Sequence, residues 1–169
     1  PMFGQPGSFA VSNDGKQLYG QIGAFIGQQE LNTAWTLKDS GTDFVEFNDS
    51  LESEGYTDIW VKNDGILFFL LKENGPLERW SASTAHDILS ISKDHSLDLS
   101  NTSWPSSLPK SFELAQDGSK VIVYGSGDSA YYGFDISTPF DLTTASYNGE
   151  SSDFSVKSEK QFLFAKQSG

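Results

Sequence analysis

Cysteine is absent from this sequence of 169 residues. Without it the chain has no disulfide framework and no thiolate nucleophile or thiolate metal ligand. Stability must therefore come from packing or from assembly. The two histidines, His86 and His95, lie nine residues apart with no third ligand at metal spacing, so we predict neither a metal site nor a bound cofactor.

Positive charge is scarce, with 11 Lys and Arg against 23 Asp and Glu and a net charge of −12. The basic residues are scattered singly, and a strongly acidic surface repels phosphate backbones, so nucleic-acid binding is not expected. Asp14 and Asp64 stand in Asn-Asp-Gly sequences that faintly resemble calcium loops, but the remaining oxygen ligands and the final Glu of such loops are missing. We interpret both residues as turn formers.

Long hydrophobic stretches are also lacking. The longest apolar run has six residues, far fewer than a membrane span needs. Residues 1–7 have neither the basic segment nor the apolar segment of a signal peptide. No window shows a sustained helical period. We therefore expect a protein made in the cytoplasm, without membrane insertion and without much helix.

The chain does contain a module that occurs three times and then begins again. Asp-Gly turns stand at 14–15, 64–65 and 117–118, which are 50 and then 53 residues apart. A Thr-Ala or Thr-Pro pair begins at Thr33, Thr84 and Thr138, at intervals of 51 and then 54. Two independent markers keep the same period, and self-similarity of this length is typical of repeat architectures.

Each module has the pattern of a β-meander. Asp-Gly between two alternating apolar runs is a strong hairpin signal, because Gly adopts positive φ without steric cost. Residues 77–80 and 131–134 supply a third strand, and residues 43–47, 89–92 and 144–147 a fourth. The run 66–71 is apolar throughout, which predicts an innermost strand covered on both faces. The predicted fold is all-β: tandem β-propeller-like blades of antiparallel four-stranded meanders, about three and a half per chain.

The modules form one predicted domain over 1–169, divided roughly into 8–55, 56–110, 111–152 and a partial module at 153–169. An open stack of blades leaves unpaired sheet edges, which favour aggregation. Three ways of closing it remain open. The Met2-Phe3 segment adds a strand to a four-bladed ring, two chains pair into a seven-bladed ring, or a larger partner covers the edge. We favour assembly over a solitary monomer.

Bulky residues recur at fixed positions of the module. Trp35, His86 and Phe140 share one position, and a second is shared by Gln29, Trp80 and Phe134. We expect both positions to serve packing between blades, His86 included.

Exposed aromatic residues are the candidate contact sites. Trp104 lies in an insertion, residues 93–109, and is a candidate contact for a partner or a sugar ring, although the interpretation we favour is that it caps the hydrophobic edge of its own blade. The Tyr131-Tyr132 pair is a candidate stacking platform.

No catalytic constellation stands out. The chain has no Gly-x-Ser-x-Gly sequence, no phosphate-binding loop, and no pair of acids that the pattern singles out. We predict that the protein is not an enzyme, with a glycosidase propeller as an unsupported alternative.

The module resembles a family of repeats. An Asp-Gly hairpin followed by Asp-Ile-Ser-Thr-Pro-Phe-Asp-Leu-Thr-Thr-Ala-Ser is similar to tandem repeats in virion structural proteins of tailed bacteriophages, especially marine ones. The third module matches best, through Phe112, Asp117, Gly118, Tyr124, Asp135, Ser137, Thr138, Phe140, Asp141, Thr144, Ala145 and Ser146.

This resemblance implies a non-enzymatic virion component, such as a decoration, fibre, tail or adaptor protein. Its expected partners are other copies of itself and other virion proteins, and its expected location is the virion. The alternative is a carbohydrate- or receptor-binding module on a virion or cell surface. That module would bind a host glycan through Trp104, Tyr131 and Tyr132.

Overall fold

The computed structural model describes residues 8–22, 25–37, 40–47, 55–73, 75–99, 109–127 and 129–153. They form three antiparallel sheets of four strands each, as predicted. Blade 1 consists of β1 (Phe9–Val11), β2 (Gln17–Ile22), β3 (Phe25–Leu31) and β4 (Ser40–Phe47). Blade 2 consists of β5 (Tyr56–Val61), β6 (Leu67–Lys72), β7 (Leu77–Ala82) and β8 (Ile91–Leu97). Blade 3 consists of β9 (Pro109–Leu114), β10 (Lys120–Gly125), β11 (Ala130–Ile136) and β12 (Ala145–Asp153).

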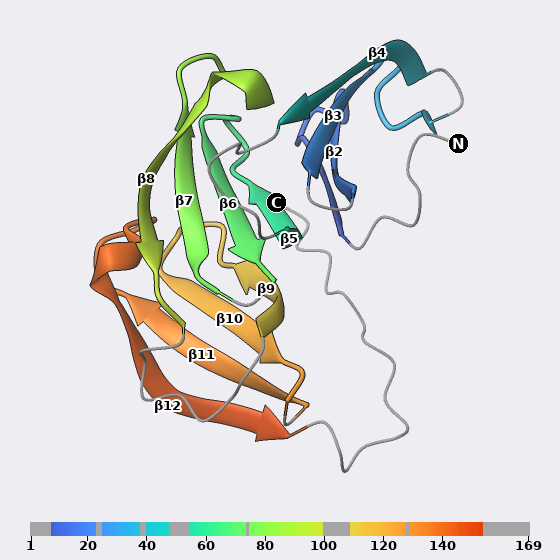
Figure 1. Cartoon of the computed structure of the whole chain (residues 1–169). Helices are drawn as coiled ribbons and strands as arrows, with labels where there is room; N and C mark the ends of the chain where they lie inside the picture. The colour runs from blue at the N-terminus through green and yellow to red at the C-terminus, as the bar shows by residue number, and fades with distance from the viewer. Residues whose placement is uncertain are drawn as a thin grey trace.

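Each sheet is a simple meander in which the strands pair in chain order. Short 3-10 turns, η2 (Ile88–Ser90) and η3 (Leu142–Thr144), precede the last strands of blades 2 and 3. The first strands, β1, β5 and β9, contact one another, and the three sheets follow one another side by side (Figure 1). The first strand of each blade is therefore the inner one, and the fourth lies outside.

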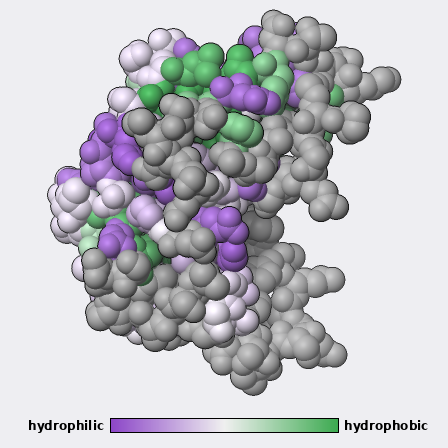
Figure 2. All heavy atoms as spheres, in the orientation of Figure 1, coloured by the Kyte–Doolittle hydropathy of each residue, from purple (hydrophilic) through white to green (hydrophobic). Residues whose placement is uncertain are grey.

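Two strands of blade 2 show how the apolar pattern relates to position. Five of the six residues of β6 are buried, on both faces of the sheet. The innermost position, however, belongs to β5 and not to this apolar run, because β6 pairs with β5 on one side and β7 on the other. The outer strand β8 is mostly exposed between its two ends, and this side of the molecule is largely hydrophilic (Figure 2).

Every blade has two faces, which we name by the neighbour that they meet. The leading face points toward the preceding blade and the trailing face toward the following one. One hydrophobic cluster joins the trailing face of blade 1, including Tyr19 and Ile26, to the leading face of blade 2, including Phe68 and Leu70. A second cluster joins blades 2 and 3 in the same way. The core therefore lies between sheets, and each blade is stable only against its neighbours.

Aromatic edge-to-face contacts strengthen these interfaces. The rings of Tyr19 and Phe68 lie 5.4 Å apart, and those of Phe47 and Trp80 5.3 Å apart, both nearly perpendicular. Such pairs contribute roughly 0.5–1.5 kcal/mol beyond their buried area. The predicted packing role of Trp80 is confirmed, since this residue lies in the cluster between blades 1 and 2.

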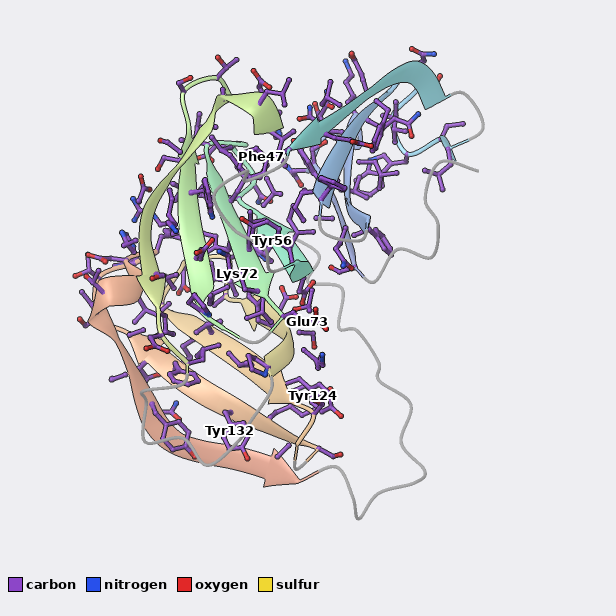
Figure 3. All side chains as sticks on the ribbon, viewed as in Figure 1. Phe47, Tyr56, Lys72, Glu73, Tyr124 and Tyr132 are labelled. Atoms are coloured by element: carbon purple, nitrogen blue, oxygen red, sulfur yellow. The ribbon has the colours of Figure 1, made fainter. Side chains whose placement is uncertain are left out.

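A buried ion pair also lies between blades 1 and 2. The Nζ atom of Lys72 lies 3.4 Å from Oε1 of Glu78, and the two side chains are only 1% and 2% exposed. The indole N–H of Trp80 donates to Glu78, and Lys93 approaches the same carboxylate. Figure 3 labels Phe47, Tyr56 and Lys72 in this region. Buried charges are tolerated when they are paired in this way, so we assign the pair a structural role.

Two features depart from the predicted layout. The insertion in the second module begins later than residue 93, because Lys93 still belongs to β8. Leu99, just beyond this strand, is buried in the cluster between blades 2 and 3.

Within the part of the chain that is described, no helix has the length and apolar character needed to cross a membrane.

Candidate functional site

An aromatic ring covers the turn glycine of each module. The turn glycines Gly15, Gly65 and Gly118 have φ values of 71°, 69° and 72°. The backbone carbonyl of each accepts a hydrogen bond from the N–H of Trp35, His86 or Phe140, at 2.8, 2.8 and 3.0 Å. A Cβ atom on any of these glycines would lie within 2.5 Å of that ring. The Asp-Gly turn therefore needs glycine for its backbone and also for the aromatic residue that covers it.

This contact adds to the expected role of the recurring bulky position. We predicted packing between blades, and each ring also covers the turn of its own blade. In blade 3 the ring does both, since Phe140 also lies 6.4 Å from the rings of Trp60 and Phe69 in blade 2. His86 of blade 2 also contacts blade 1, because the hydroxyl of Tyr19 lies 3.2 Å from Nδ1 of His86.

The turn aspartates act as predicted. Asp14, Asp64 and Asp117 each accept a hydrogen bond at 3.0 Å from the backbone N–H two residues later. The hydroxyl and backbone N–H of Ser119 hold the pKa of Asp117 below its usual range. Among the described residues, no group of three or more His, Asp or Glu is arranged to hold a metal ion.

Polar side chains join successive blades near the ring that covers each turn. Gln28 of blade 1 donates through Nε2 to the carbonyl of His86 at 2.6 Å and accepts through Oε1 from the N–H of Ile88 at 2.7 Å. One amide thus binds both ends of a backbone segment in the next blade. The sequence pattern did not reveal this residue, because Gln28 carries no motif.

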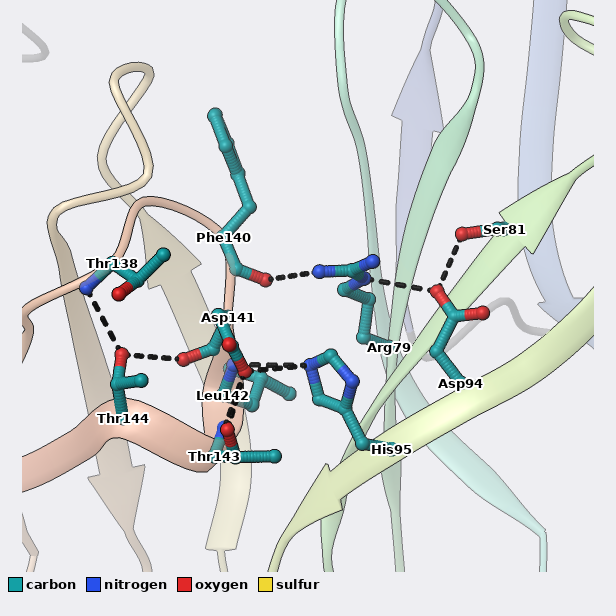
Figure 4. A network of polar contacts seen from close by, with 10 residues as sticks. All are labelled: Arg79, Ser81, Asp94, His95, Thr138, Phe140, Asp141, Leu142, Thr143 and Thr144. Atoms are coloured by element: carbon teal, nitrogen blue, oxygen red, sulfur yellow. Dashed lines mark hydrogen bonds and ion pairs between the residues drawn. The ribbon is translucent and has the colours of Figure 1, made fainter.

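In blade 2, two residues together make the backbone contacts that Gln28 makes in blade 1 (Figure 4). Arg79 donates to the carbonyl of Phe140 at 3.1 Å, and His95 accepts at Nε2 from the N–H of Leu142 at 3.1 Å. Asp94 orients the guanidinium of Arg79 at 3.0 Å and also accepts from the hydroxyl of Ser81. His95 is thus a hydrogen-bond acceptor between blades.

A second set of contacts between blades lies at the inner strands. Ser8 and Asp58 occupy equivalent positions, seven residues before the turn glycine. The N–H of Ile59 lies 3.4 Å from Oγ of Ser8, and the N–H of Phe112 donates to Oδ2 of Asp58 at 2.8 Å. Asp58 also accepts from the hydroxyl of Ser8. The side-chain oxygen at this position therefore binds the first strand of the following blade.

The inner strands also border a polar pocket of about 370 Å³. Burial raises the pKa of Asp58 in spite of the hydrogen bonds from Ser8 and Phe112. Burial likewise raises the pKa of Glu113, which accepts a hydrogen bond from Trp60. No Lys or Arg is among the described residues that line this pocket.

The pKa of Asp58 predicts an unusual pH dependence. A carboxyl whose pKa is higher in the folded protein stabilises the fold below its unfolded pKa, and this contribution is lost as the pH rises through the folded pKa. The stability of the wild type relative to Asp58→Asn, measured by urea unfolding, should therefore decrease from about pH 4 to pH 7. Asp117→Asn is the matched control with the opposite sign, because the pKa of Asp117 is lowered. A wild-type advantage over Asp58→Asn that grows with pH would contradict the assignment.

The leading face of blade 1 exposes several large apolar side chains. It is formed by apolar residues around an open groove of about 400 Å³. Phe9, Leu37 and Trp35 are 68%, 66% and 65% exposed. The residues lining the groove are Phe9, Val11, Leu18, Gly20, Leu31, Trp35 and Leu37.

The repeat explains why these residues are apolar. At the positions of Phe9 and Leu37, blade 3 has Phe112 and Leu142, both of which are buried against blade 2. Blade 2 has Ile59 and Ile88 there, and both are buried against blade 1. The leading face of blade 1 thus has the composition of a face that meets another blade.

The predicted contact residues do not gather into one site. Trp104 lies outside the described residues. Tyr132 is 2% exposed and lies in the cluster between blades 2 and 3, whereas Tyr131 is half-buried on the trailing face of blade 3 beside Tyr124. Successive residues of a strand point to opposite faces, so Tyr131 and Tyr132 do not form a joint stacking platform. The segment Met2-Phe3 and the partial module after residue 153 also lie outside the described residues.

No protein-family model and no curated protein matches this sequence. Solved structures do match. A putative 6-phosphogluconolactonase from Bacteroides fragilis superposes with a TM-score of 0.54 at 16% identity, over 86% of this chain and 38% of the other. A second one, from Bacteroides uniformis, has a TM-score of 0.52 at 12% identity, over 83% of this chain and 39% of the other. A protein from Lactobacillus plantarum has a TM-score of 0.52 at 15% identity, over 82% and 38%.

The chain has a β-propeller fold. At these identities the likeness shows the fold alone, and this chain spans less than two fifths of the length of the chains that it matches. The predicted all-β, propeller-like architecture is confirmed.

The predicted function is contradicted. Two of the matching structures are described as putative 6-phosphogluconolactonases, and none of the three is described as a phage structural protein. The assignment to a virion component was based on degenerate motifs. In the structure these motifs form the blades. Asp-Gly hairpins and Thr-Ala or Thr-Pro segments serve the geometry of a blade, so they do not specify where a propeller works.

Proposed function

We propose that this chain is a blade-stacking unit of a propeller, and that its function is to bind a further blade through the leading face of blade 1. One observation carries the proposal: residues that are buried against a preceding blade in blades 2 and 3 have exposed apolar counterparts in blade 1. Exposed apolar residues that lie together on one face are a feature of interaction sites. Burying each large side chain of the face contributes roughly 1.5–3 kcal/mol, before the costs of association are subtracted.

The internal interfaces define the chemistry of the partner. A trailing face presents aliphatic and aromatic side chains from the second and third strands of its sheet, such as Phe69 and Leu77. It also presents a donor and an acceptor for the backbone of the next blade, as Gln28 does. The partner of blade 1 is thus a four-stranded antiparallel sheet with an apolar centre and polar groups opposite Trp35 and Leu37.

We propose a binding role for the described residues rather than hydrolysis of a phosphorylated lactone. A phosphate group is bound in proteins by cationic side chains or by aligned N–H groups. The pocket beside the inner strands contains Asp58 and Glu113 and no basic residue among those described. Two carboxyls repel a phosphate, so this pocket does not support the activity named for the matching structures.

Leu37→Ser tests the proposal, with Leu89→Ser as the control. Leu37 and Leu89 are similarly exposed, at 66% and 58%, but Leu89 does not line the groove. We expect Leu37→Ser to reduce the binding of a hydrophobic dye to dilute protein, and to weaken self-association at least tenfold in sedimentation experiments. Leu89→Ser should behave like the wild type. Equal dye binding and equal association in all three proteins would overturn the proposal.

A further inference from the structure

We infer that the blade received by the leading face of blade 1 is blade 3 of a second copy of this chain, so that copies associate head to tail. The inference rests on the proposed function, because it names the partner of the same face. Its evidence is separate and lies on the opposite side of the molecule, on the trailing face of blade 3.

This second outer face has the apolar positions of a trailing face. Ile122, Tyr124 and Tyr131 are equivalent by repeat position to Phe69, Leu71 and Leu77, which pack against blade 3. Ile122 is 49% exposed, and the rings of Tyr124 and Tyr131 lie 5.1 Å apart. Both ends of the blade stack thus carry exposed residues of the kind that the internal interfaces bury.

Polar groups of blade 3 occupy the places of the internal contacts between blades. Ser111 stands at the position of Ser8 and Asp58, whose oxygens bind the N–H of the following blade's first strand. In a second copy, the donor to Ser111 would be the backbone N–H of Phe9, which stands at the position of Ile59 and Phe112. The hydroxyl of Ser111 is on an exposed residue, so it is accessible to that group.

An amide also stands where Gln28 stands in blade 1. The equivalent residue of blade 3 is Gly133, and the side-chain amide of Asn148 fills the space beside it, 3.0–3.4 Å from where a Cβ atom would lie. An amide both donates and accepts. Within blade 3 the Nδ2 atom of Asn148 lies 3.5 Å from Oδ1 of Asp135. In a second copy the amide of Asn148 would exchange this contact for the carbonyl of Trp35 and the N–H of Leu37, as Gln28 serves His86 and Ile88.

Charge is compatible with this pairing. The groove of blade 1 is lined by no charged residue among those described, so the acidic chain meets no like charge there. Head-to-tail contacts of this kind close into a ring when the rotation between copies permits it.

A complementation experiment tests the inference. One variant, Leu37→Ser, has a damaged leading face, and the double variant Ile122→Ser/Tyr131→Ser has a damaged trailing face. We expect the wild type to sediment as a dimer of about twice 18.5 kDa. Each variant alone should dissociate at concentrations at least tenfold higher than the wild type. An equimolar mixture should associate again, because it restores one intact pair of faces.

Other outcomes overturn the inference. If the trailing-face variant associates like the wild type while Leu37→Ser does not, the leading face binds something other than blade 3, and only the proposed function survives. A monomeric wild type, or a mixture with no recovery, also overturns it. Circular dichroism and thermal unfolding of each variant, with Leu89→Ser as the control, separate loss of association from loss of folding. The substituted residues are exposed or half-buried in the single chain, so each variant should fold.

Discussion

Gly118→Ala should destabilise the protein by about 3 kcal/mol or more, as measured by urea unfolding. Two costs add. An alanine at φ 72° requires the left-handed conformation, which costs roughly 1–2 kcal/mol. Its Cβ atom would also lie 2.5 Å from Cγ of Phe140, and forcing a methyl group into a packed site costs typically 1–3 kcal/mol. The ring of Phe140 cannot move away freely, because the backbone N–H of Phe140 donates a hydrogen bond to the carbonyl of Gly118.

Gly149→Ala is the matched control for the backbone cost. Gly149 has φ 82°, and nothing lies within 4 Å of the place that its Cβ would take. This variant should lose only about 1–2 kcal/mol. If Gly118→Ala costs no more than Gly149→Ala, the ring makes no tight contact with the turn.

A double-mutant cycle isolates the contact itself. Phe140→Ala removes the ring, so Gly118→Ala should cost at least 1 kcal/mol less in that background than in the wild type. Additive losses would show that the two residues are independent.

Leu142→Ala should cost about 2–5 kcal/mol, whereas Leu37→Ala should cost less than about 0.5 kcal/mol in the monomer. Both leucines stand two residues after the residue that covers the turn. Leu142 is almost fully buried against blade 2, and Leu37 is exposed on the leading face of blade 1. The residue type and the repeat position are the same, so the difference measures the contribution of the preceding blade.

Protein concentration provides the control for this comparison. In dilute solution the cost of Leu37→Ala should stay near zero, and it should increase where the chain associates, because association stabilises the folded state by mass action. The cost of Leu142→Ala should change little with concentration. Equal costs at both positions in the monomer would contradict the equivalence that underlies the proposed function.

The local structure of each blade was predictable from short stretches of sequence. Asp14-Gly15, Asp64-Gly65 and Asp117-Gly118 all form the expected turns. The third strands of the second and third modules were also predicted, and each predicted fourth strand overlaps the observed one in part. These predictions hold because a tight turn and an alternating strand depend on residues near one another in the chain.

The contacts between blades were not predictable in this way. Nothing in the sequence indicates that Gln28, Arg79 and His95 bind the backbone of a neighbouring blade, more than 40 residues away. Asp58 has no motif either, and its raised pKa follows from burial. The Tyr131-Tyr132 pair was misread because adjacent tyrosines suggest one surface, whereas a strand separates them onto two faces.

The sequence by itself determined the repeat, the meander within each module and the acidic, cysteine-free composition, because these depend on local residue order and on residue counts. Only the tertiary structure decided which apolar residues are core and which are surface. Leu37, Ile88 and Leu142 are equivalent in the sequence, yet burial depends on whether another sheet lies opposite. The leading face of blade 1 became visible as a binding surface only when the blades were placed beside one another.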